Sequence, residues 1–197
     1  MNHRRWRFAV SKYTGTLRLA ILLSIVAALG AWRIFEPAAW TQHASPRLAS
    51  TLQGYARAVD GDTIELSGTR IRLHGIDAPE SAQTCLTGTL AYRCGERATL
   101  ALIDLVRGQI VRCEPTGLDQ YRRTIARCKI DSGGVDINAW LVREGLAVAY
   151  RRYSYEYVPD ETIARIAKRG LWAGTFQMPW DYRAETRNDR IHPGPAK

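Results

Sequence analysis

The sequence predicts an α+β domain built on a five-stranded β-barrel with about three helices, and three observations lead to this prediction. Short runs rich in β-branched and aliphatic residues occur as a group of three and then a group of two. Segments with helical periodicity lie between these groups and after them. Turn residues such as Asp60-Gly61-Asp62 and Ser67-Gly68 separate the runs. This order, on about 120 residues, is typical of a five-stranded Greek-key barrel.

The individual elements follow from the same patterns. We expect strands at residues 52–59, 63–67, 69–76, 109–115 and 123–130. Amphipathic helices are expected at residues 96–107, 136–144 and 159–169; a glycine follows each of them, and Pro159 begins the last. Residues 80–95 are expected to form an irregular loop.

The chain divides into four predicted parts: a basic flank with an apolar segment (1–35), a linker rich in Pro, Ala and Ser (36–50), the barrel domain (51–175) and a C-terminal tail (176–197). The net charge of +9 comes mostly from residues 1–50, which carry six of the nine charges. The domain itself is close to neutral. The overall charge is therefore weak evidence for a nucleic-acid partner. As a separate prediction, we expect the protein to be a monomer.

The apolar run Leu19–Trp32 is 14 residues long and follows several cations. It is shorter than the roughly 17–25 residues of a transmembrane helix and resembles the core of a signal peptide. Snorkelling of Arg33 would lengthen it into an anchor. Cleaved signal and uncleaved anchor both remain open, and both predict an exported domain, periplasmic or extracellular, held at the inner membrane if uncleaved. A buried helix of the soluble domain is the third alternative.

Four cysteines fit an oxidising compartment. Cys113 and Cys128 lie symmetrically about a turn near Tyr121, so a hairpin would place them opposite each other. Cys85 and Cys94 could close the loop that contains them. The alternative is four unpaired thiols. A zinc site is not expected, because the sequence has no C-x₂-C pair and its four histidines are scattered.

Two acidic motifs are candidates for a metal site. Asp62 precedes the second strand and Asp77 follows the third, so the hairpin between them can bring both carboxylates to one end of the barrel. Two carboxylates, a backbone carbonyl and waters are ligands that Ca²⁺ accepts. Arg72 and Arg123 carry planar guanidinium groups, whose geometry matches the oxygens of a phosphodiester in the transition state of its cleavage. Taken singly, each motif also reads as an ordinary turn, cap or surface ion pair.

Four motifs together resemble the staphylococcal nuclease (thermonuclease) family, in its order and spacing, between about Leu52 and Trp172. They are Asp60-Gly61-Asp62-Thr63, Ile71-Arg72-Leu73 running into Asp77-Ala78-Pro79-Glu80, Asp119-x-Tyr121-x-Arg123, and Leu141 to Ala147. The resemblance implies an OB-fold barrel with Asp62, Asp77 and the Ala78 carbonyl as calcium ligands. It also implies that Glu80 holds or activates water and that Arg72 and Arg123 bind the scissile phosphate.

The sequence also departs from this family. Arg122 stands where the family usually has Gly, Ala78 where Thr is common, and the cysteine-bearing loop 81–95 replaces a lysine-rich one. Tyr121, Tyr150 and Tyr153 are candidates for contacts with the nucleotide, since aromatic rings stack on bases.

By this resemblance we expect a calcium-dependent phosphodiesterase that cleaves DNA, and RNA as a further candidate, leaving 3′-phosphate ends. The rival hypothesis is a catalytically weak OB-fold module that binds nucleic acid or protein. An envelope adaptor that binds protein is a third. The presence of Glu80 argues against both rivals, because a binding module has no need of it.

Overall fold

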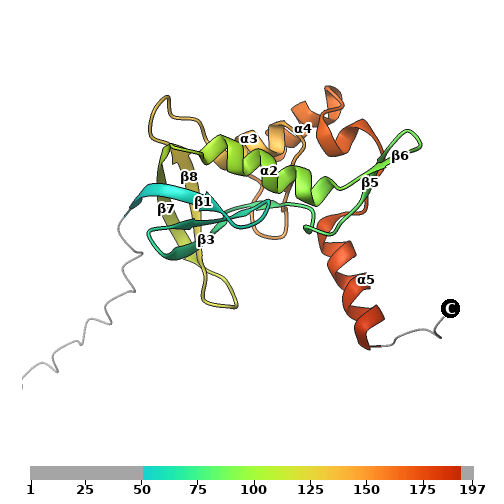
Figure 1. The fold of residues 1–197 in the computed structure, drawn as a ribbon, viewed down its shortest axis with the longest axis horizontal. Coiled ribbons are helices and arrows are strands. Elements are labelled where there is room, and N and C mark those ends of the chain that lie inside the picture. Colours follow the sequence, from blue (N-terminus) through green and yellow to red (C-terminus); the bar gives the residue numbers. More distant parts are fainter. Residues whose placement is uncertain (1–50, 192–197) are drawn as a thin grey trace, which may run out of the picture. The chain divides into compact units, whose positions relative to one another are not determined.

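A closed barrel of five strands lies at the centre of the computed structural model, which describes residues 51–191 (Figure 1). The barrel order is β1-β2-β3-β8-β7, and β7 pairs back with β1. Neighbouring strands are antiparallel except for β3 and β8, which are parallel. The strands are β1 (Leu52–Ala58), β2 (Thr63–Leu66), β3 (Thr69–Leu73), β7 (Ile110–Leu118) and β8 (Thr124–Ile130).

All five predicted barrel strands are therefore confirmed. The parallel pair needs a long crossover, because parallel neighbours cannot be joined by a tight turn. The chain between β3 and β7 contains the helix α2 (Cys94–Val106). The predicted leader and linker, residues 1–35 and 36–50, lie outside the described residues.

The core follows from side-chain alternation along the strands. In β2 and β3, Ile64, Leu66, Ile71 and Leu73 are almost fully buried, while Arg70 between them is exposed. Leu102 of α2 and Leu141 of the next helix are also fully buried in the same cluster. Burial of this apolar surface is the main force that holds the barrel and helices together.

The three predicted helices are present, with ends shifted by one to three residues. They are α2, α3 (Ile137–Arg143) and α4 (Val158–Ile166). Asp136 caps α3 by accepting a hydrogen bond from the Ala139 amide at 2.8 Å. The buried Asn138 ties α3 to the barrel: its Oδ1 accepts from the Cys128 amide at 3.1 Å, and its Nδ2 donates to the His74 carbonyl at 2.9 Å.

The prediction of an irregular loop at residues 80–95 is wrong for part of this segment. A short hairpin forms there from β5 (Cys85–Thr87) and β6 (Leu90–Tyr92), which turn at Gly88. Strands of three residues are too short to give a periodic signal. A second small sheet pairs β4 (Ile76–Asp77) with β9 (Val148–Ala149), and it fixes Asp77 against Val148.

Both predicted disulfides are confirmed. Cys113 and Cys128 are direct cross-strand partners in β7 and β8, with Cα atoms 4.1 Å apart. The bond between Cys85 and Cys94 joins the start of β5 to the start of α2, with Cα atoms 5.6 Å apart. All four cysteines are thus paired.

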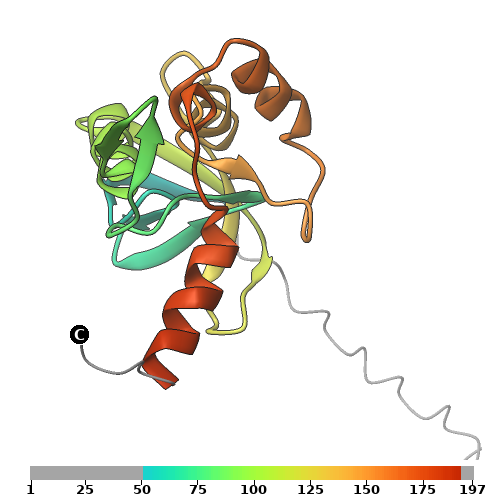
Figure 2. The ribbon, with the colours of Figure 1, turned by 90° about the vertical axis from the view of Figure 1, so that its right-hand side faces the viewer.

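A further helix lies within the predicted C-terminal tail. After the short 3₁₀ turn η1 (Gly170–Ala173), the helix α5 (Pro179–Ile191) begins at a buried proline and extends away from the barrel (Figures 1 and 2). Its N-terminal end is tied down by the buried side chain of Gln83, which donates to the Gln177 carbonyl at 2.7 Å. Within residues 51–191, no helix has the length and apolar composition needed to cross a bilayer.

The hairpin disulfide gives the first prediction. Replacing Cys113 and Cys128 by alanine should lower the free energy of unfolding by roughly 3 kcal/mol, because the unfolded chain regains the freedom of a 15-residue loop. Urea denaturation of the oxidised proteins measures the difference. Reductant should then destabilise the variant less than the wild type. Equal sensitivity of the two proteins to reductant would contradict the assignment.

Candidate active site

Asp62 and Asp77 meet at one end of the barrel because the β2–β3 hairpin folds back on itself. Asp62 immediately precedes β2, and Asp77 ends β4, just beyond β3. Thr63 pairs with Arg72 across the hairpin, and the Leu73 amide donates to the Asp62 carbonyl at 2.9 Å. Both aspartates are buried, with 4% and 0% of their surface exposed.

The Arg72 guanidinium joins the two carboxylates. Its Nη1 donates to Asp62 Oδ1 at 2.5 Å, and its Nη2 donates to Asp77 Oδ1 at 2.6 Å. The second oxygen of Asp62 accepts the Ala78 amide at 2.9 Å. The structure therefore brings four of the predicted site residues together: Asp62, Arg72, Asp77 and Ala78.

Asp62 lies in surroundings that disfavour its negative charge. Burial raises the pKa of Asp62 to about 7, and repulsion from Asp60 and Asp77 adds to this effect, although Arg72 opposes it. Burial alone would lower the pKa of Arg72, but the attraction of Asp62 and Asp77 outweighs it and raises that pKa. An added cation would therefore relieve the repulsion between the two carboxylates.

The donor set at this end of the barrel fits calcium rather than zinc. Two carboxylates lie together, and the Ala78 backbone adjoins them, while water can supply further ligands. Within residues 51–191, no group of three or more His, Cys, Asp or Glu side chains is arranged to hold a metal. A closed site made of protein side chains alone, as zinc requires for a structural role, is therefore not found there.

The segment from Ala78 to Glu80 is held by close contacts with two glycines. A Cβ atom on Gly61 would lie 2.7 Å from that of Ala78, and one on Gly95 would lie 1.8 Å from the Glu80 carbonyl oxygen. Only glycine permits the start of α2 and the turn before β2 to approach this segment so closely. Glu80 itself is 43% exposed at the side chain and faces the site.

Sequence reasoning missed one residue of the site, Arg183 on α5. Its Nη2 donates to Asp77 Oδ2 at 2.7 Å, and its Nη1 donates to Asp77 Oδ1 at 3.1 Å and to Glu80 Oε1 at 2.9 Å. Burial opposes its charge, but the bonds to Asp77 and Glu80 raise its pKa. The sequence analysis gave residues 176–197 only as a C-terminal tail, so it predicted neither the helix α5 nor the contact of Arg183 with the site.

Arg123, by contrast, does not contact the carboxylate pair. It lies just before β8, whose first residue pairs with Ile71, next to Arg72. Its Nε donates to Asp119 Oδ2 at 2.6 Å, and its guanidinium lies over the exposed Tyr121 ring at 5.6 Å. Arg122 has a φ of 63°, the left-handed conformation that favours glycine. This explains why the family usually has Gly at that position.

The predicted tyrosines form an aromatic cluster with α5. Tyr150 and Tyr153 meet edge to face with ring centroids 4.9 Å apart. Trp180 of α5 stacks on Tyr150 at 5.4 Å, with the rings nearly parallel. One face of Tyr150 is therefore covered by Trp180, whereas Tyr153 is 67% exposed.

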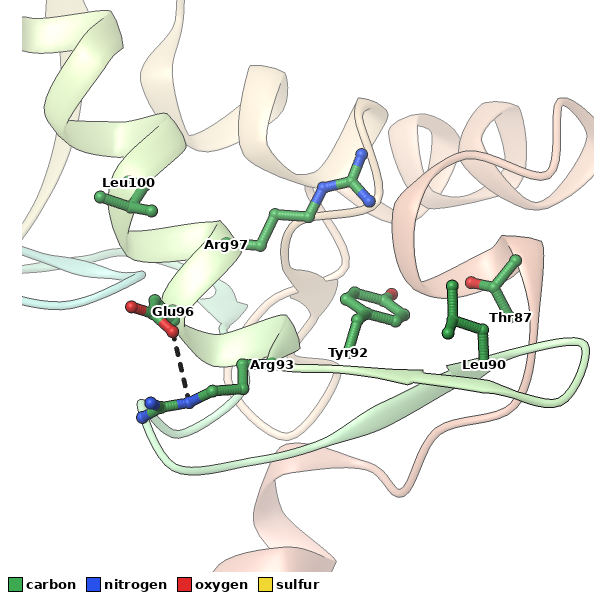
Figure 3. A pocket seen from close by; sticks show the side chains of 7 residues that line it. All are labelled: Thr87, Leu90, Tyr92, Arg93, Glu96, Arg97 and Leu100. Carbon is green, nitrogen blue, oxygen red and sulfur yellow. Dashed lines mark ion pairs between the residues drawn. The ribbon is translucent and has the colours of Figure 1, made fainter.

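Two hollows lie on the surface of the domain. The smaller one is polar and is lined by the site itself, including Asp62, Arg72 and Glu80. The larger one lies between the β5–β6 hairpin and α2, where Arg93 pairs with Glu96 at 3.3 Å (Figure 3). Apolar side chains and Arg97 line the rest of it, and it holds no pair of carboxylates. Predicted site residues therefore line the smaller hollow and not the larger one.

A closed five-stranded barrel of this topology defines an OB-fold domain, and in this chain acidic and guanidinium groups gather at one end of the barrel. The family model described as "Staphylococcal nuclease homologue" matches residues 70–174. The chain therefore belongs to the staphylococcal nuclease family, as the sequence motifs indicated.

Individual relatives support the same family. The chain is 42% identical over 102 residues to the succinoglycan biosynthesis protein ExoI of Rhizobium meliloti, a match covering 51% of this chain and 53% of that protein. It is 36% identical over 151 residues to a micrococcal nuclease of Shigella flexneri, covering 67% and 80%. Protein ParB of Escherichia coli is 32% identical over 163 residues, covering 75% and 87%. The chain thus spans about half the length of the first relative.

The raised pKa of Asp62 gives a prediction about stability in the metal-free protein. A carboxyl whose pKa is higher in the folded state stabilises the fold below its ordinary pKa, and that stability is lost as pH rises to about 7. In the presence of chelator, raising the pH from 5 to 8 should therefore lower the free energy of unfolding of the wild type by roughly 2 to 3 kcal/mol more than that of Asp62→Asn. The variant has no carboxyl proton to release at this position. Urea denaturation at both pH values measures this. Parallel pH dependence in the two proteins would refute it.

Proposed function

We propose that this protein is a calcium-dependent nuclease that hydrolyses phosphodiester bonds of DNA, with RNA as a second substrate. The observation that carries the proposal is the buried pair of carboxylates, Asp62 and Asp77, bridged by Arg72 beside Glu80. Family membership and the relatives named as nucleases support it.

Each residue of the site has a role in this proposal. Asp62, Asp77 and the Ala78 carbonyl would hold Ca²⁺, which when bound supplies positive charge to the phosphate and orients water. Arg72 presents a planar guanidinium group that can donate two hydrogen bonds to the equatorial oxygens of the five-coordinate phosphorus in the transition state. Glu80 accepts the proton of the attacking water, because its exposed carboxylate lies at the edge of the site.

Arg123 and the tyrosines would bind the substrate around the scissile bond. To bind the phosphate, the Arg123 side chain would exchange its ion pair with Asp119 for the phosphate oxygens. Tyr121 and Tyr153 are exposed and can stack on bases, whereas Tyr150 supports Tyr153 from behind.

We further propose that the domain acts as a monomer outside the cytoplasm, at the cell envelope or beyond. Two disulfides are typical of oxidising compartments, and the leader sequence is typical of export. If the leader stays uncleaved, it would hold the domain at the membrane.

Degradation of plasmid DNA and of RNA, with calcium or with chelator, tests the proposed function directly. Cleavage that needs calcium supports it. Binding without cleavage would instead favour a catalytically weak OB-fold module.

Asp77→Asn gives a sharper test. The variant should lose calcium-dependent cleavage almost completely, because a neutral amide is a poor ligand for a hard cation. The barrel should remain folded, since removing one charge also relieves repulsion with Asp62. Asp104→Asn is the matched control, because Asp104 is 69% exposed on α2 and pairs only with Arg107 among the described residues. Unchanged activity of Asp77→Asn at limiting calcium would contradict the assignment of Asp77 as a calcium ligand.

The two arginines after Tyr121 give another prediction. Arg123→Ala should slow cleavage by roughly 10²–10³, the scale of losing a charged donor to the phosphate in the transition state. Arg123→Lys should restore part of the rate, since it keeps the charge but lacks the fork. Arg122→Gly should leave the rate nearly unchanged, because it only relieves the left-handed backbone at that residue. Initial rates on one DNA substrate measure all three. An inactive Arg122→Gly beside an active Arg123→Ala would mean that the phosphate belongs to Arg122.

A further inference from the structure

Glu80 has a single side-chain partner within residues 51–191, and that partner is Arg183. The Arg183 Nη1 atom donates to Glu80 Oε1 at 2.9 Å and to Asp77 Oδ1 at 3.1 Å. One guanidinium therefore spans the buried aspartate and the half-exposed glutamate. The Glu80 backbone is fixed separately, since its amide donates to Gln83 Oε1 at 3.2 Å.

A glutamate at the edge of a site does not stay in one conformation by itself. Fixing a long charged side chain costs roughly 1.5–2 kcal/mol of lost rotamer freedom. With 43% of its side chain exposed, Glu80 gains little from packing. A charge-assisted bond to an arginine that is itself held by Asp77 offsets this cost and aims the carboxylate toward the site.

Arg183 can do this because the first turn of α5 is anchored. Gln83 holds the Gln177 carbonyl, Pro179 is buried, and Trp180 stacks on Tyr150. Arg183 follows Trp180 by three residues, so both lie on the same side of the helix. That side faces the barrel at Trp180 and Arg183, whereas Arg187, one turn further along the same side, is exposed.

We propose that Arg183 is a positioning residue of the active site, which holds Glu80 beside Asp77 so that it can take a proton from water. The inference rests on the proposed nuclease function. It assigns a part of the site to a helix beyond residues 70–174, the region that the family model matches. Arginine suits this role better than lysine, because its fork reaches two carboxylates at once.

A double-mutant cycle between Arg183 and Glu80 tests the proposal. Arg183→Ala should slow cleavage at saturating calcium by about 10- to 100-fold, the scale of misplacing a reacting group. In a Glu80→Ala background, the same substitution should change the cleavage rate by no more than about twofold, because no carboxylate remains to be positioned. The slow cleavage of these variants is measured over long incubations. Arg183→Lys should recover part of the loss.

Two controls separate positioning from folding. Arg187→Ala removes an exposed arginine one turn along α5 and should leave the rate unchanged. Calorimetric titration with calcium and thermal melting should show that Arg183→Ala still folds and still binds calcium. Should Arg183→Ala unfold, Arg183→Lys in the same cycle carries the test.

The outcomes are distinct. If Arg183→Ala reduced the cleavage rate equally in the wild-type and Glu80→Ala backgrounds, the proposal would be overturned. Arg183 would then act on the phosphate or on the stability of the fold, and not through Glu80. A faster Arg183→Ala would also overturn it and make α5 an inhibitor. A wild-type protein that does not cleave nucleic acid with calcium contradicts the proposed function itself, whereas an active wild type with an equally active Arg183→Ala contradicts only the role of Arg183.

Discussion

The bridge from Arg72 to both Asp62 and Asp77 is the interaction on which the site depends. Two ionised carboxylates taken out of water cost several kcal/mol each unless they are paired. Here they are almost completely buried, and the guanidinium that joins them is 20% exposed. The pairing offsets part of the cost of burying the carboxylates, and it keeps the two aspartates close together.

The rest of the fold serves this arrangement. The β2–β3 hairpin sets the position of Asp62 relative to Arg72, and the small β4–β9 sheet fixes Asp77. Close approach at Gly61 and Gly95 presses the segment with Glu80 against the barrel. Because these contacts come from β-structure, a turn and a helix start, the site is held by elements far apart in the sequence, as a preorganised site needs.

The sequence was sufficient for the barrel, the three central helices and the disulfides, because each leaves a local pattern. Strand alternation, a glycine after each helix and the symmetric placement of Cys113 and Cys128 about a turn are all readable from neighbouring residues. The meeting of Asp62, Arg72 and Asp77 was readable too, since one hairpin connects them. The family resemblance supplied Ala78 and Glu80 at the same place.

What the sequence could not supply depends on long-range packing or on very short elements. The β5–β6 hairpin has strands of three residues, which carry no period. Arg123 was expected to bind the scissile phosphate with Arg72, and in the structure Asp119 holds it in a local ion pair. Arg183 lies more than 100 residues from Asp77 in the chain, and nothing in the pattern of a polar terminal helix indicates its partner.

The slender attachment of α5 has a consequence for how the protein responds to heat. Segments held by few buried contacts open at a lower free energy than the core of the same domain. Beyond its first turn, α5 is joined to the site by the hydrogen bonds of Arg183, while the barrel is held by a continuous core and a disulfide. Fraying of α5 would release Glu80 while the barrel stays intact. On the proposed role of Arg183, activity would decline at temperatures where the fold, followed by its β-structure, still persists.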